Sequence, residues 1–450
     1  MMKKMKIHQM PNKKGLFYML VSENLGVNEK GHLTAGGIDT VELAKQYGTP
    51  LYIMDENLIR KHAKSYRESM EKFYDGNGLV CYASKAFCCM EMCRVMKDEG
   101  IGLDVVSIGE LYTAYKAGVD FSKVYFHGNN KTDEELEYAV DLNVGRIIVD
   151  NAYELERLDK IAEKKGVKAN IMFRIKPGID AHTHDFVRTG QIDSKFGFAL
   201  ETGEAMEAVK KAIACQNVNL KGLHCHIGSQ IFAIDPFIEA AQVMLKFIAD
   251  IKKDTGHEIS ELNLGGGFGI MYTEKDDPVP YEKYMEKVSV AVKESCENLG
   301  IKLPFILIEP GRSMAGPAGI TLYTCGGIKN IPNIRTYVSV DGGMTDNPRY
   351  ALYQSEYDAL VANKADQPKD MTVTIAGKCC ESGDLIGEGM PIQKVEAGDI
   401  IAVCATGAYN YSMSSNYNRI PKPAVVFLKD GQSRIAVKRE TLDDIIRNDI

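Results

Sequence analysis

The stretch RIIVDNAYELERLDKIAEKKGVKANIMFRI (146–175) decides the fold class. It begins and ends with apolar runs, at 146–150 and 170–175, that are typical of β-strands buried on both faces. Between them, Leu155, Leu158, Ile161 and Ala162 recur at helical spacing, so one side of the intervening segment (153–165) is apolar. The stretch therefore predicts a strand, an amphipathic helix and a second strand, which is the repeating unit of parallel sheets.

The same unit repeats on both sides of this stretch. Eight apolar runs alternate with segments of helical spacing: LVCYA (79–83), LDVVS (103–107), VYFHG (124–128), RIIVD (146–150), NIMFRI (170–175), LKGLHCHIG (220–228), LNLGG (262–266) and FILIE (305–309). Eight such units in a row, with apolar strands, favour a closed parallel barrel. An open doubly wound sheet would need GxGxxG after its first strand, and GGGFG (265–269) has a different spacing. We therefore predict a TIM-like (β/α)8 barrel over residues 50–315.

The pattern changes after about Pro317. The later segments are β-rich with Gly or Asp-Gly turns: ITLYTC (320–325), TYVSVDGG (336–343), MTVTIAG (371–377), DIIAVCAT (399–406) and AVVFLKDGQSRIAV (424–437). LTAGGIDTVEL (33–43) is expected to add strands from before the barrel. These segments predict a second, mostly antiparallel β domain, a barrel or sandwich formed by residues 15–49 and 316–450.

Composition narrows the function classes. The chain has 450 residues, 45% hydrophobic and 26% charged, which fits a globular protein with room for two domains. A net charge of −7 leaves no basic surplus for nucleic acid. The basic start (1–20) lacks a signal core, and no stretch approaches the length of a membrane span. Eleven cysteines without paired zinc-type spacing predict reduced thiols in a cytoplasm.

In barrel enzymes the active site forms where the strands end. Lys85 follows the first apolar run, and a lysine at a barrel mouth can bond covalently to a carbonyl. Glu309 ends the eighth run, where its carboxylate could hold a pyridine nitrogen protonated. The glycines at 265–267 follow the seventh run and would let backbone N–H groups approach a phosphate.

His224 and His226 lie at the end of the sixth run and leave an alternative open. Two histidines at this spacing share one face, so a metal pair competes with a stacking role for the imidazole. His127 and Asp104 could add ligands at other strand ends, yet the set of ligands is sparse. We therefore predict no metal ion at this site.

The motifs at these strand ends resemble those of the barrel-type pyridoxal-phosphate-dependent decarboxylases. The resemblance rests on YASKAF (82–87), HCHIGSQ (224–230), LNLGGGFG (262–269), IEPGRS (308–313) and CCESGD (379–384). Three further blocks resemble the diaminopimelate decarboxylases in particular: IDAHTHDFVRTGQIDSKFGF (179–198), DNPRYALY (346–353) and GAYNYSMSSNYNRIPKPA (407–424). The resemblance covers the chain from about Tyr52 to its end.

The resemblance implies a role for each matching position. Lys85 would bind pyridoxal 5′-phosphate covalently, and Cys380 would donate a proton, which makes these two the catalytic residues. Other positions would hold the cofactor (His226, Ser229, Gly266, Gly267, Glu309, Gly311, Arg312 and Tyr409) or an amino-acid substrate (Arg312, Arg349, Tyr353, Glu381 and Tyr409). The resemblance also implies a homodimer in which Cys380 and its neighbours reach the partner subunit's active site.

Charge adds an argument about the substrate. Diaminopimelate carries a second amino-acid head, and Arg312, Arg349 and Glu381 supply cations for its carboxylate and an acid for its amine. Substrates without the distal carboxylate would leave buried guanidinium groups unpaired. Two other classes stay open: a metal-dependent hydrolase that uses His224 and His226, and a non-catalytic protein that binds pyridoxal phosphate. The joint presence of Lys85, Glu309 and Cys380 argues against the latter.

Overall fold

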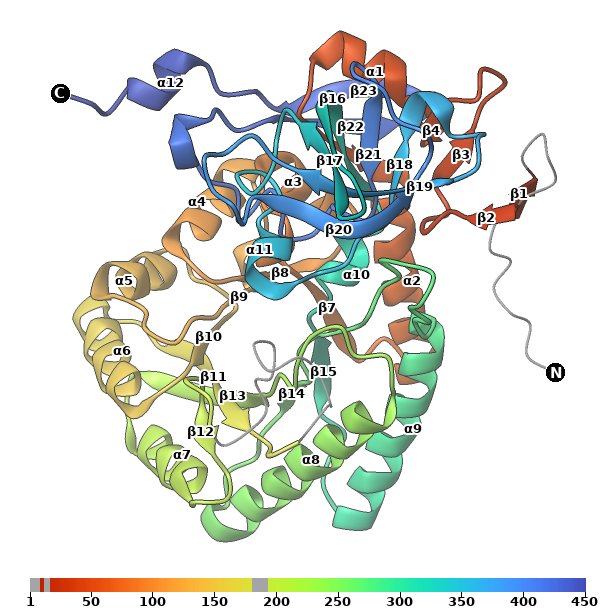
Figure 1. The fold of residues 1–450 in the computed structure, drawn as a ribbon. Coiled ribbons are helices and arrows are strands. Elements are labelled where there is room, and N and C mark those ends of the chain that lie inside the picture. The colour runs from red at the N-terminus through yellow and green to blue at the C-terminus, as the bar shows by residue number, and fades with distance from the viewer. Residues whose placement is uncertain (1–8, 12–16, 180–192) are drawn as a thin grey trace. The chain divides into compact units, whose positions relative to one another are not determined.

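The computed structural model describes residues 9–11, 17–179 and 193–450, which divide into two compact units (Figure 1). The barrel unit comprises the described residues of 60–269 and 278–313. The sheet unit comprises the described residues up to 59, together with 270–277 and 314–450. Most of the block quoted at 179–198 and most of the basic start (1–20) lie outside the described residues.

Eight parallel strands form a closed ring in the barrel unit. They are β7 (Gly78–Ala83), β8 (Gly102–Val105), β9 (Val124–Phe126), β10 (Arg146–Val149), β11 (Ala169–Lys176), β13 (Val218–His224), β14 (Glu261–Asn263) and β15 (Phe305–Ile308). Each pairs with the next, and β15 pairs with β7 to close the ring. Each predicted apolar run overlaps one of these strands, so the predicted (β/α)8 barrel is confirmed.

Helices surround the ring in Figure 1. Those that follow strands are α3 (Met90–Asp98), α4 (Ile108–Ala117), α5 (Asp133–Asp141), α6 (Ala152–Lys165), α7 (Glu204–Ala214), α8 (Asp235–Thr255) and α9 (Tyr281–Leu299), and α2 (Glu56–Tyr74) precedes β7. The predicted stripe of α6 is buried, Asn151 caps its first turn through the Glu154 N–H, and Gly166 (φ 63°) ends it. The apolar spacing and the two caps explain why this segment is a helix.

The barrel interior is filled in layers of alternating strand residues. An apolar layer contains Cys81, Tyr125, Ile148, Met172 and Leu307. Glycine is required at two positions beside this layer, because a Cβ on Gly102 would lie 2.6 Å from the Lys123 carbonyl oxygen and one on Gly222 would lie 2.6 Å from the Glu261 carbonyl oxygen. At the amino ends of the strands, Arg146 Nε donates to Glu261 Oε2 (2.8 Å). Side chains therefore fill the barrel interior, and the residues available for chemistry lie at the carboxyl ends of the strands.

The sheet unit is built around β16 (Gly319–Ile331), which pairs with β6 (Leu51–Asp55), β17 (Arg335–Val340) and β21 (Ile400–Val403), all antiparallel. The sheet continues through β19 (Met371–Ala376), β20 (Leu385–Ile392), β22 (Ala424–Lys429) and β23 (Gln432–Val437), and β18 (Ala359–Val361) pairs with β21. Parallel pairs join only β17 to β19 and β22 to β6 among these strands. The predicted mostly antiparallel domain is confirmed.

Two details of the sheet unit differ from the sequence-based picture. Residues 51–55 were placed at the start of the barrel domain, but β6 pairs with β16 and β22. The segment 33–43 forms part of a separate three-stranded sheet, β3 (Leu25–Val27), β4 (Leu33–Ala35) and β5 (Ile38–Asp39), followed by α1 (Thr40–Tyr47). Within the described part of the chain, no helix has both the length and the apolar character that a membrane span requires.

Candidate functional site

Polar side chains fill the carboxyl end of the barrel interior. Side chains alternate along a strand, so the residue two positions after a member of the apolar layer faces the same interior. In four strands that residue is polar: His127 after Tyr125, Asp150 after Ile148, Arg174 after Met172 and Glu309 after Leu307. Register adds Asp104, which pairs with Ala83, and Asn263, which pairs with Leu307 and His224. Fold and sequence together place the charged groups in one layer.

Glu309 is the centre of this polar layer. Its side chain is 6% exposed, and His127 Nε2 lies 2.8 Å from Oε1. Asn263 Nδ2 donates to Oε1 (2.6 Å), and His224 Nε2 lies 3.2 Å from Oε2. Burial by itself would raise the pKa of the Glu309 carboxyl, but the imidazoles of His127 and His224 outweigh it and hold the pKa well below its usual range. Glu309 is therefore a buried carboxylate at neutral pH.

The loop after β14 packs closely against the neighbouring strand ends. A Cβ on Gly266 would lie 2.0 Å from the Glu309 carbonyl oxygen, and one on Gly267 (φ 111°) would lie 2.3 Å from the Gly228 carbonyl oxygen. Only glycine fits at these two positions. The Gly266 N–H donates to His226 Nδ1 (3.3 Å). Burial lowers the pKa of His226 well below 6.5, with Lys85 as the next cause, so its ring is neutral at neutral pH.

Lys85 follows β7 in a short 3-10 helix, and its side chain is exposed. Two acids lie within its electrostatic reach, the buried Asp104 and the half-buried Glu110. Burial raises the pKa of Asp104, and burial raises the pKa of Glu110 to about 7 although the Val106 N–H donates to this carboxylate (2.8 Å). A Cβ on Gly311 would meet Ala83 Cβ at 2.9 Å, so the ends of β7 and β15 approach closely. The strand ends that adjoin Lys85 and Glu309 therefore lie next to each other.

Arg312 and Ser229 meet at the same end of the barrel. Arg312 Nη2 donates to Ser229 Oγ (2.9 Å), and Arg312 is 7% exposed. Arg312 begins the short helix α10 (Arg312–Ala315) after β15, and Ser229 lies on the loop after β13, on either side of the glycine loop that follows β14. The structure therefore brings together the predicted cofactor residues of the barrel unit: Lys85, His226, Ser229, Gly266, Gly267, Glu309, Gly311 and Arg312.

The metal alternative takes a different form in the structure. Among the described residues, His127, His224 and Glu309 are the group whose ligand atoms lie close enough for a metal ion, within 4.8 Å of one another. The predicted pair of His224 and His226 is not this group, because His226 accepts a hydrogen bond from the glycine loop. Burial lowers the pKa of His224 to about 4, so the neutral ring donates from Nε2 to Glu309.

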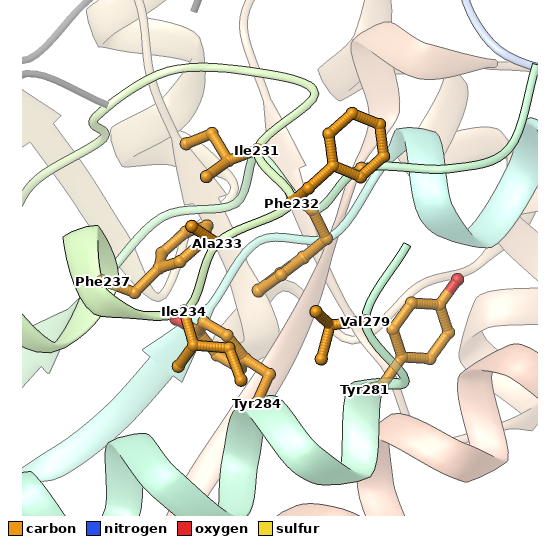
Figure 2. Close-up of a pocket in the computed structure, with 10 residues that line it drawn as sticks. Ile231, Phe232, Ala233, Ile234, Phe237, Val279, Tyr281 and Tyr284 are labelled. Carbon is orange, nitrogen blue, oxygen red and sulfur yellow. The ribbon is translucent and has the colours of Figure 1, made fainter. Parts of the chain in front are cut away.

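A small apolar pocket lies beside the glycine loop (Figure 2). The Ile231 N–H donates to the Gly267 carbonyl (2.9 Å), and the Gly269 N–H donates to the Ile231 carbonyl (3.0 Å). None of the ten lining residues is charged: Ile231, Phe232, Ala233, Ile234, Phe237, Phe268, Gly269, Val279, Tyr281 and Tyr284. The residues that line this pocket pack against the glycine loop and offer no acid–base chemistry of their own.

In the sheet unit, Arg349 begins the short helix α11 (Arg349–Tyr353) and is 7% exposed. Its Nη1 donates to the hydroxyls of Tyr272 (2.9 Å) and Tyr357 (3.1 Å). Its guanidinium also lies 5.9 Å from the Tyr353 ring and 5.4 Å from the Tyr409 ring. No carboxylate of the described residues pairs with Arg349. A buried cation with aromatic walls and no anion is suited to bind an anionic ligand group.

Cys380 and Glu381 are exposed in a loop of the sheet unit. The Cys380 N–H donates to Asn418 Oδ1 (2.8 Å), and the Cys379 N–H donates to Asp384 Oδ2 (2.6 Å). Asp384 Oδ1 also accepts from the Met344 N–H (2.5 Å), which ties this loop to the segment that leads into α11. The two predicted substrate motifs, CCESGD and DNPRYALY, therefore adjoin each other.

Sequence reasoning missed several residues of these two groups. Arg174 and Asp150 could have been found by counting two positions on from the apolar layer of their strands, whereas Asn263 is placed only by strand register. Tyr272 and Tyr357 carry no signal in the sequence, because only the fold brings them to Arg349.

Comparisons with known proteins agree on one family. The family model described as "Pyridoxal-dependent decarboxylase, pyridoxal binding domain" matches residues 56–316. The diaminopimelate decarboxylase of Bacillus methanolicus is 51% identical, with 92% of this chain and 96% of that protein covered. The one from Bacillus subtilis (strain 168) is 48% identical, with 94% and 96% covered. The crystal structure of diaminopimelate decarboxylase from M. jannaschii in complex with L-lysine matches with a TM-score of 0.88 at 35% identity, covering 96% and 99%.

Proposed function

The chain belongs to the diaminopimelate decarboxylases, a group of pyridoxal-dependent decarboxylases, and we propose that its active site combines the barrel end of one subunit with the Cys380 loop of another. The enzyme removes one carboxyl group from meso-2,6-diaminopimelate and releases L-lysine and CO2, the last step of lysine biosynthesis. The observation that carries the proposal is the placement of Lys85, His226, the glycine loop and Glu309 at one end of a closed barrel.

The barrel end fits pyridoxal 5′-phosphate at each part of that molecule. Glu309 is a buried carboxylate that can pair with a pyridine nitrogen, and the glycine loop leaves no room for side chains where backbone N–H groups would meet a phosphate. Ser229 and Arg312 add a hydroxyl and a cation beside that loop. When bound, the cofactor supplies an electron sink for the electrons that remain when CO2 leaves.

The residues of the barrel unit bind and orient the cofactor. Lys85 would supply the amine that holds the cofactor covalently. The His226 ring is neutral and held by the Gly266 N–H, so its flat face can stack on the cofactor ring. Glu309 keeps a proton on the pyridine nitrogen, because an ionised carboxylate stabilises the cationic form of its partner.

Cys380 supplies the proton that replaces CO2. A thiol donates from Sγ to the carbon that has lost its carboxyl group, and general acids of this kind act within hydrogen-bond reach. The side chains of Cys380 and Glu381 are exposed on a loop whose backbone is held by Asn418 and Asp384. An exposed reactive loop on a fixed backbone supports a role at a second subunit's site in a homodimer.

The sheet unit supplies recognition of the distal end of the substrate. Arg349 is a buried cation without a carboxylate among the described residues, and we assign the distal carboxylate to it. Tyr353 and Tyr409 form aromatic walls of this site, and Glu381 would accept the distal ammonium. We also place the enzyme in the cytoplasm, because all eleven cysteines are free thiols.

The proposed function is tested by CO2 release from four substrates: meso-diaminopimelate, lysine, ornithine and arginine. Purified protein is first saturated with pyridoxal phosphate, and Lys85→Ala serves as the control for chemistry that does not use the site. We expect release from diaminopimelate to exceed release from the other three by about 10⁴-fold, because they lack a partner for Arg349. Equal release from all four, or release by Lys85→Ala at the wild-type rate, contradicts the proposal.

A further inference from the structure

Three hydrogen bonds link Asn263, Gly265 and Glu309 into a closed ring. The Gly265 N–H donates to Asn263 Oδ1 (2.9 Å), Asn263 Nδ2 donates to Glu309 Oε1 (2.6 Å), and the Glu309 N–H donates to the Gly265 carbonyl (2.7 Å). One side chain thus contacts both the glycine loop and the acid proposed to bind the pyridine nitrogen. The family roles taken over from the motifs do not include Asn263.

The orientation of the Asn263 amide follows from its partners. The Gly265 N–H can only donate, so it must face the amide oxygen, and the NH2 group must then face Glu309. Asn263 is 0% exposed, so no water competes for either bond. The bond to Glu309 is charge-assisted and short, which places it among the stronger hydrogen bonds of proteins.

Other polar groups also surround the Glu309 carboxylate. His127 and His224 contact it from β9 and β13, and Arg174 and Asp104 lie within electrostatic reach from β11 and β8. Of these residues and Asn263, only Asn263 also bonds to the glycine loop.

We propose that Asn263 is a positioning residue that fixes Glu309 relative to the glycine loop, so that both ends of the cofactor meet their protein partners at once. This inference rests on the proposed function, because it assigns the pyridine nitrogen to Glu309 and the phosphate to the loop. A fixed spacing between the two protein partners lowers the cost of ordering them when the cofactor binds.

The test is Asn263→Asp, which keeps the acceptor for Gly265 and replaces the donor to Glu309 by an acidic oxygen. Two carboxylates 2.6 Å apart cannot both ionise, so the new group keeps its proton well above the usual pH for an acid. The protonated group still donates to Glu309, and the group repels Glu309 once it ionises as the pH rises. The dissociation constant for pyridoxal phosphate, measured by titration of apoprotein, should be near the wild-type value at pH 6 and at least about tenfold weaker at pH 8.

Three further variants show whether this pH dependence comes from the bond between residue 263 and Glu309. Asn219→Asp, at a partly buried Asn219–Asn170 pair (3.0 Å) on the same barrel, should show the wild-type pH dependence. Asn263→Ser removes the bond to Glu309 without adding charge, so it should weaken binding by a similar factor at both pH values. In a Glu309→Gln background, Asn263→Asp should lose its pH dependence, because a glutamine amide can donate to either form of the new acid.

Wild-type affinity in both Asn263 variants would overturn the inference. So would weaker binding that is independent of pH in Asn263→Asp and additive with Glu309→Gln, because that pattern marks general damage to the barrel. Should Asn263→Asp fail to fold, as judged by circular dichroism of the apoprotein, additivity of Asn263→Ser with Glu309→Gln decides the question. Failure of wild-type apoprotein to bind pyridoxal phosphate at all would instead contradict the proposed function.

Discussion

At the scale of single residues, Lys85 is an exposed amine beside acids that the barrel buries. Asp104 is 3% exposed and Glu110 is half-buried, and both lie within electrostatic reach of the exposed lysine. This arrangement leaves the amine free to react and keeps opposite charge close to it.

We expect borohydride to fix pyridoxal phosphate on Lys85. Reduction makes the bond between the amine and the cofactor's aldehyde irreversible, so the modified peptide can be identified by mass spectrometry. Lys131, which is buried and bound to three acceptors, serves as an internal control that should stay unmodified. An adduct mapped to any lysine other than Lys85 would refute the assignment.

The group of His127, His224 and Glu309 leads to a prediction about metal removal. Both Glu309 oxygens already face N–H donors, and a pyridinium rather than a cationic metal is proposed as their ligand. Dialysis against a strong chelator should therefore leave decarboxylation unchanged when pyridoxal phosphate is present. Activity lost on chelation and restored by Zn²⁺ would favour the metal-dependent alternative.

Arg349 is predicted to act on the substrate and not on the cofactor. Arg349→Ala should lower kcat/KM for diaminopimelate by at least about a hundredfold, the size of effect seen when a buried charged partner is removed. Bound pyridoxal phosphate should stay at one per subunit. Arg335→Ala, at an exposed arginine paired with Glu388, is the matched control and should leave both unchanged. Equal loss of cofactor and activity would show that Arg349 supports folding instead.

At the scale of elements, a buried ion pair braces the strand ends around the site. Lys131 Nζ donates to Glu154 Oε1 (2.7 Å) and to the carbonyls of Gly128 (2.8 Å) and Ile148 (2.7 Å). The two side chains are 1% and 2% exposed. Lys131 precedes α5 and Glu154 lies in the first turn of α6, so the pair joins two consecutive strand–helix units.

Loss of one partner of this pair should destabilise the barrel unit strongly. Lys131→Met leaves the Glu154 charge buried without compensation, and we expect a loss of about 3–5 kcal/mol in the free energy of unfolding, measured by urea denaturation. Adding Glu154→Gln to Lys131→Met should recover part of the lost free energy of unfolding. The control is Lys164→Met, which breaks an exposed pair between the same two helices and should cost less than about 1 kcal/mol. Equal losses in the two single variants would contradict this account.

The barrel strands could be predicted because strands buried on both faces leave continuous apolar runs. The hairpin of β22 and β23 could be predicted too, since Asp430 and Gly431 (φ 49° and 76°) adopt the turn that Asp-Gly favours. The run Leu51–Asp55 is equally apolar, so its pairing in the second sheet could not be told from a barrel strand. The polar layer could be predicted only in part, because the place of Asn263 in it follows from strand register.

At the scale of the whole molecule, the proposal divides the chemistry between two subunits. The barrel unit contains Lys85, and the sheet unit contains Cys380 on an exposed loop. Closed two-fold symmetry gives each dimer two equivalent sites, and each would take one group from either chain.

The measurement that tests this central claim most directly is complementation between two inactive variants, Lys85→Ala and Cys380→Ala. Differently tagged subunits are mixed, exchange is confirmed by co-purification, and CO2 release from diaminopimelate is then measured. A mixed dimer would contain one site that lacks both groups and one intact site, so random pairing predicts recovery to at most about a quarter of the wild-type activity. Confirmed exchange without recovered activity would contradict the shared site and would leave Cys380 to act within its own chain or not at all.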